Sequence, residues 1–139
     1  MRRLLIASIL AVILVPGCGG DTGAPATSFC TAIGEINDSF DTLTRTMLAA
    51  NVGEDQGEFA EALQRTVDLL TANVARASAE KRDASQLLAS AYADFAELVD
   101  EAGYDLSQLA SDDPRATALT SDGFRQALIT LNEGCDTQP

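Results

Sequence analysis

Apolar side chains recur at helical spacing through most of this 139-residue chain. The first run, at intervals of four, three, four, three and four residues, consists of Phe29, Ile33, Ile36, Phe40, Leu43 and Met47. Because an α-helix turns once in 3.6 residues, this spacing places the six side chains on one face of a helix. We expect Thr27 or Ser28 to cap its start and Asn51-Val52-Gly53 to end it.

Two more apolar stripes follow. The second consists of Phe59, Leu63, Val67 or Thr66, Leu70, Val74 and Ala77. The third consists of Leu88, Ala91, Phe95, Leu98 and Ala102, flanked by Leu87, Tyr92 and Val99. One helix over residues 58–102 would be about 67 Å long, more than a small domain can cover. We therefore predict a turn within residues 78–84, with Asp83 and Gln86 forming a capping box at the start of the third helix.

The end of the third helix and the start of the last are marked by turn residues. Gly103 is expected in the left-handed conformation, with Tyr104 folding back on Leu98 or Val99 as in a Schellman motif. Residues 105–120 read as an irregular connection in which Asp113-Pro114 begins a short helix. The last helix is expected to start near Ser121. Its apolar positions are Phe124, Leu128 and Leu131, and Cys135 continues their spacing.

Four antiparallel helices in up-down-up-down order place the start of the first beside the end of the fourth. Cys30 and Cys135 lie at those two ends. The sequence therefore predicts an all-α fold, an antiparallel four-helix bundle closed by a Cys30–Cys135 disulfide. Closing a loop of this size would stabilise the fold by at most about 4.7 kcal/mol.

The N-terminal sequence is typical of an export signal. Arg2 and Arg3 precede an apolar run from Leu4 to Val15 that is too short to cross a bilayer. The following sequence, Val15-Pro16-Gly17-Cys18, resembles a lipobox, the cleavage site of bacterial lipoproteins. This resemblance implies that Cys18 is lipidated, with acyl chains such as palmitate. We expect a signal peptide over 1–17, a lipidated Cys18 with a flexible tether over 18–26, and the bundle over 27–139.

The alternative is plain secretion, with cleavage between Gly17 and Ala26. That arrangement would leave Cys18 as an exposed, unpaired thiol in an oxidising compartment, which argues for lipidation. Two or more acyl chains hold a protein firmly on a membrane, whereas one binds only marginally. The sequence therefore predicts a cell-membrane protein, anchored by lipid on the extracytoplasmic face.

The composition excludes several classes of function. The chain has a formal charge of −12, and loss of Arg2 and Arg3 with the signal peptide would leave 7 basic and 21 acidic residues, or −14. Such a domain repels nucleic acid and anionic lipid headgroups. The chain also contains no His and no Trp, so sites that depend on an imidazole or an indole are excluded. We expect no cofactor and no metal.

The acidic side chains that could bind a metal ion have a simpler explanation. We interpret five carboxylates as a solvated acidic face: those of Asp94, Glu97, Asp100 and Glu101, and that of Asp105 just beyond them. A di-iron bundle would also need Glu-x-x-His pairs, which the sequence lacks. Weak Ca²⁺ binding at this face or at Asp112-Asp113 stays open, although no EF-hand spacing is present.

Three side chains could take part in chemistry of their own. Lys81, the only lysine, is expected in an exposed polar turn. Tyr92 and Tyr104 could hold an apolar ligand or haem, but ordinary packing explains both. We therefore predict no catalytic residues and no enzymatic activity.

Three segments carry a family resemblance. They are Phe29-Cys30, the Ser78-Ala79-Glu80 turn leading to Ala89-Ser90-Ala91-Tyr92, and the stretch from Phe124 to Cys135. Together they resemble small actinobacterial cell-envelope lipoproteins, which pair a cysteine in the first helix with one near the chain end. Ala79 stands where those proteins often have Pro. The resemblance implies fold and location and brings no catalytic residues.

The function expected from the sequence is non-enzymatic binding or scaffolding in the cell envelope, with an envelope protein as partner. The alternative is a carrier for a small apolar ligand held between the helices. A carrier needs a cavity of about 300 Å³ or more, whereas a scaffold packs solid.

Overall fold

The computed structural model describes residues 25–51, 53 and 55–135, and their regular structure is entirely helical. The elements are α1 (Pro25–Asn51), α2 (Gln56–Arg76), α3 (Ala79–Glu101), η1 (Leu106–Gln108), α4 (Pro114–Ala118) and α5 (Asp122–Asn132). The predictions for residues 1–24, including lipidation of Cys18, lie outside the described residues.

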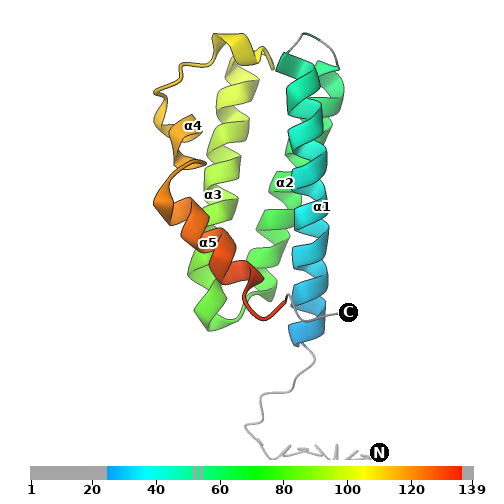
Figure 1. Cartoon of the computed structure of the whole chain (residues 1–139), viewed down its shortest axis with the longest axis vertical. Helices are drawn as coiled ribbons and strands as arrows, with labels where there is room; N and C mark the ends of the chain where they lie inside the picture. Colours follow the sequence, from blue (N-terminus) through cyan, green and yellow to red (C-terminus); the bar gives the residue numbers. More distant parts are fainter. Residues whose placement is uncertain (1–24, 52, 54, 136–139) are drawn as a thin grey trace, which may run out of the picture.

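The helices form an antiparallel bundle (Figure 1). α1 rises, α2 descends, α3 rises again, and α5 descends across the lower half of α3 toward the start of α1. α4 and α5 both pack on α3. The predicted four-helix bundle is confirmed, with the expected short α4 preceding a last helix of 11 residues.

The core consists of two groups of buried side chains. The disulfide-end cluster comprises Phe29, Ile33, Ile36, Leu70, Ala77, Leu88, Ala89, Ala91, Phe124, Ala127 and Leu131. The distal cluster comprises Leu43, Ala50, Phe59, Ala62, Leu63, Phe95, Leu98 and Val99. Tyr92 and Leu119 pack against both clusters and link them.

The apolar stripes predicted from the sequence largely coincide with the buried faces of the helices, and the differences are on α2. Thr66, not Val67, is fully buried, and its hydroxyl donates to the Ala62 carbonyl at 2.8 Å. Asn73 is buried where Val74 was expected. Its amide donates to Ser85 Oγ at 3.4 Å, while its Oδ1 has no hydrogen-bond partner in the described part of the chain.

The turn between α2 and α3 is shorter than predicted. α3 begins at Ala79 with Ser78 as N-cap, so the predicted capping box at Asp83 and Gln86 is wrong and both residues lie inside the helix. Ala77 and Ser78 are extended, with ψ of 138° and 165°, and these two residues reverse the chain without Gly or Pro. Ala77 is itself buried, which anchors the turn to the core.

The start of α1 also differs from the prediction. The helix begins at Pro25, so Thr27 and Ser28 lie within its first turn and not at the N-cap position. Proline suits the first helical position because the N–H it lacks would have no partner there. The last two residues of the predicted tether therefore belong to the helix.

The predicted end of α3 and the predicted starts of α4 and α5 are confirmed. Tyr104 N donates to Val99 O and Gly103 N to Asp100 O, both at 2.9 Å, which are the two bonds of a Schellman motif. Asp113 caps α4 with Pro114 at its first position, and Ser121 Oγ caps α5 by accepting from Phe124 N at 3.1 Å.

Candidate functional site

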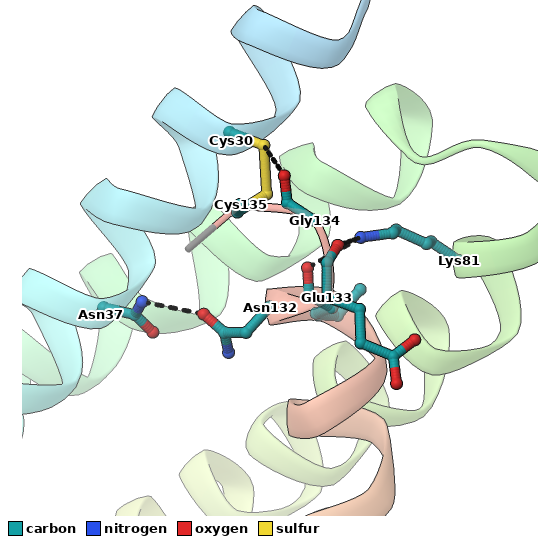
Figure 2. The surroundings of a disulfide bond; sticks show 8 residues. Cys30, Asn37, Lys81, Asn132, Glu133, Gly134 and Cys135 are labelled. Carbon is teal, nitrogen blue, oxygen red and sulfur yellow. Dashed lines mark hydrogen bonds between the residues drawn. A yellow bond between two sulfur atoms is a disulfide. The ribbon is translucent and has the colours of Figure 1, made fainter. Parts of the chain in front are cut away.

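The predicted disulfide joins the first helix to the segment after the last one, at one end of the bundle. Cys30, in the second turn of α1, is bonded to Cys135, which follows α5, and their Cα atoms are 5.2 Å apart. Figure 2 shows the bond linking the segment after α5 to α1, and both cysteines pack against the disulfide-end cluster. The pairing expected from helix order is therefore confirmed.

Lys81 reinforces the same end of the bundle, a role that the sequence did not reveal. Its Nζ donates to the Leu131 carbonyl at 3.1 Å and to the Glu133 carbonyl, so it caps the C-terminus of α5 (Figure 2). The ammonium also lies 5.1 Å from the centre of the Phe29 ring. A cation is stabilising there, because the last carbonyls of a helix carry partial negative charge. The expected exposed position is wrong: Lys81 is half-buried.

We expect Lys81→Met to lower the free energy of unfolding by about 1–2 kcal/mol, since both carbonyls lose a charged donor while most of the aliphatic stem is kept. That loss corresponds to roughly 5–10 °C in melting temperature, measurable by circular dichroism. Arg65→Met is the matched control, because it removes one positive charge from an exposed position on α2. Equal melting temperatures for the two variants would contradict the capping role.

The acidic residues singled out on the third helix lie on its exposed surface. Asp94, Glu97, Asp100 and Glu101 are all exposed on α3. In the part of the chain that the structure describes, no group of three or more His, Cys, Asp or Glu side chains is placed to hold a metal ion.

Three carboxylates act at helix ends or in ion pairs: those of Asp105, Asp113 and Glu101. Asp105 accepts hydrogen bonds from Ser107 and Gln108 at η1, and these bonds lower its pKa. Arg115 pairs with Glu101 at 3.0 Å and with Asp113 at 3.3 Å. Hydrogen bonds from Arg115 hold the pKa of Asp113 below its usual value.

The two tyrosines pack against phenylalanines. The Tyr92 ring stacks on Phe40 at 5.2 Å and lies 5.8 Å from Phe124, and burial raises the pKa of Tyr92 to about 12. The Tyr104 ring meets Phe59 edge-on at 6.4 Å. Burial and the neighbouring Asp100 carboxylate, to which it is hydrogen-bonded, raise the pKa of Tyr104. Both side chains therefore have structural partners.

A surface groove of about 400 Å³ lies between α2 and α3. We call it the α2–α3 groove. From α2 it is lined by Ala60, Leu63, Gln64 and Val67. From α3 and the residues after it, it is lined by Ala93, Ala96, Glu97, Asp100 and Tyr104. This groove was not predicted from the sequence, where its signal is the alanines beside the two apolar stripes.

Comparisons with protein families, with curated proteins and with solved structures gave no match to this chain. None of the helices in the described part of the chain combines the length and the hydropathy that a transmembrane helix needs.

Proposed function

We propose that this protein is a lipid-anchored, non-enzymatic binding or scaffolding protein on the extracytoplasmic face of the cell membrane. The observation that carries the proposal is the Cys30–Cys135 disulfide. Disulfides persist in oxidising compartments outside the cytoplasm, in agreement with the export sequence read at residues 1–17. The lipobox-like Val15-Pro16-Gly17-Cys18 supports an anchor at Cys18.

The position of the disulfide gives the anchored domain an orientation. The seven residues from Cys18 to Ala24 span at most about 25 Å, so the start of α1 would stay near the membrane. The disulfide lies at this end, whereas the last turns of α1 and α3 lie at the opposite end (Figure 1). The distal half of the bundle, including the α2–α3 groove, would face away from the bilayer.

The chemistry of the α2–α3 groove supports binding over catalysis. Its polar side chains are an amide, two carboxylates and a phenol, with no imidazole in the whole sequence. The raised pKa of Tyr104 disfavours a phenolate base at neutral pH.

The same groove favours a binding surface over a carrier. Its volume exceeds the roughly 300 Å³ that a small ligand needs. However, its lining includes the exposed side chains of Gln64, Ala93, Glu97 and Asp100. A carrier site usually buries most of the ligand surface, which such an open, acidic groove does not do.

The resemblance to small actinobacterial envelope lipoproteins remains part of the proposal. It rests on the residues quoted above, among which Cys30 and Cys135 are paired as the resemblance implies.

The decisive test is Cys18→Ser in the full chain, expressed with its own leader. We expect the wild type in the membrane fraction, with a denatured mass that includes its acyl chains, and the variant in the soluble fraction. Cys30→Ser is the control, because it removes a cysteine but keeps the anchor. Retention of Cys18→Ser in membranes would refute the lipid anchor.

A further inference from the structure

The floor of the α2–α3 groove is built from small apolar side chains. Ala60, Ala93 and Ala96 present only methyl groups, and Leu63 and Val67 complete the floor from α2. From Ala60 to Val67 this face extends about 10 Å along the helix, or two turns. Small side chains allow a further helix to approach closely, since interaxial distances of 8–10 Å depend on the residues at the contact.

The rim of the groove is acidic and has no basic side chain of its own. Glu97 and Asp100 line it one turn apart on α3, and both are exposed. No Lys or Arg is among the lining residues. Arg65 lines a different pocket, between α1 and α2, and Arg115 pairs with Glu101 and Asp113.

Tyr104 closes one end of the groove in an unusual backbone conformation. Its φ of 63° lies in the left-handed region, which is rare for a bulky residue. The Schellman bond to Val99 and the edge contact with Phe59 hold it there. The groove thus ends at a fixed aromatic ring, a type of side chain enriched at protein interfaces.

We propose that the α2–α3 groove docks an amphipathic, cationic helix of a partner protein. Its small apolar residues would lie on the alanine floor, and its Arg or Lys side chains would reach Glu97 and Asp100. This is the helix-in-groove mode of recognition, with charge complementarity setting register and association rate. The inference rests on the binding role proposed above and names its surface and partner class.

Other occupants fit the groove less well. A second copy of this chain would add to the repulsion between molecules that each carry −12. A small apolar ligand would cover the floor but leave the carboxylates of Glu97 and Asp100 without a countercharge.

The experiment measures peptide binding to the full chain, expressed with its own leader and purified from whichever fraction contains it. The probe is a helical peptide of about 18 residues, or five turns, with Ala and Leu on one face and Arg flanking that face. A matched peptide carries Glu in place of each Arg. We expect the Arg peptide to bind, more weakly at higher salt, and the Glu peptide not to bind.

Two variants test the site. The double variant Glu97→Lys with Asp100→Lys should weaken binding about tenfold or more, because it places like charges at the rim. Ala93→Leu should also weaken binding, because it fills the groove from an exposed position and leaves the charges unchanged. The control is Glu35→Lys with Asp41→Lys, two exposed sites on α1, which changes the net charge by the same amount. Its affinity should stay close to that of the wild type.

Several results would overturn the proposal. These are no binding of the Arg peptide, equal weakening by the rim and control double variants, or no effect of Ala93→Leu. A stable dimer that Ala93→Leu dissociates would assign the groove to a second copy instead. The fraction in which the chain is found tests the anchor separately, so failure of the lipoprotein proposal and failure of the groove proposal give different results.

Discussion

Replacing Cys30 or Cys135 with alanine is expected to lower the free energy of unfolding by about 3–4 kcal/mol. The bond closes a loop with a sequence separation of 105, and the chain-entropy account gives up to about 4.7 kcal/mol for a loop of this size. This is a large share of the 5–15 kcal/mol that a small domain has in total. The melting temperature should fall by roughly 15 °C or more.

The measurement is thermal and urea unfolding of both single variants, the double variant and the wild type with reductant. All four should unfold alike, because each loses the same single bond. Cys18→Ser is the matched control and should melt like the wild type, since Cys18 has no part in the Cys30–Cys135 bond. A double variant as stable as the oxidised wild type would contradict the expected contribution.

The fold was largely predictable because apolar residues recur at regular helical spacing. Residues with strong preferences for helix boundaries also mark where the helices start and end. Gly103, Asp113-Pro114 and Ser121 each act where their residue type predicts, and helix order alone paired Cys30 with Cys135. The capping box of α3 was placed too late in the chain because the turn has no Gly or Pro, and its only local signal is Ser78, a residue type common at the N-cap. Ala77, which precedes it, is extended and buried in the core.

The candidate site was less predictable, since it depends on contacts between distant parts of the chain. Nothing near Lys81 in the sequence indicates that it reaches carbonyls 50 and 52 residues away. The α2–α3 groove likewise forms only when Ala60 and Ala93, on different helices, come together. The exposed acidic face of α3 was foreseen, but its place beside an apolar floor was not.

Phe59→Ala is expected to cost about 3–5 kcal/mol, because Phe59 is fully buried in the distal cluster and its removal leaves a cavity. The edge contact with Tyr104 would be lost as well. Phe59→Leu should cost less, since it fills more of the same space. Leu48→Ala is the control: Leu48 is 62% exposed, so its truncation should change stability by less than about 0.5 kcal/mol.

The disulfide cannot compensate for this loss. Phe59 belongs to the distal cluster, whereas Cys30 and Cys135 pack against the disulfide-end cluster, so their effects should add. A variant lacking both would lose about 6–9 kcal/mol, enough to unfold a domain in the lower part of the usual range of about 5–15 kcal/mol. Urea unfolding of the single and combined variants tests this. If Phe59→Ala were no more harmful than Leu48→Ala, the distal cluster would not hold Tyr104 and Leu63 in place, and the α2–α3 groove would lose its fixed floor.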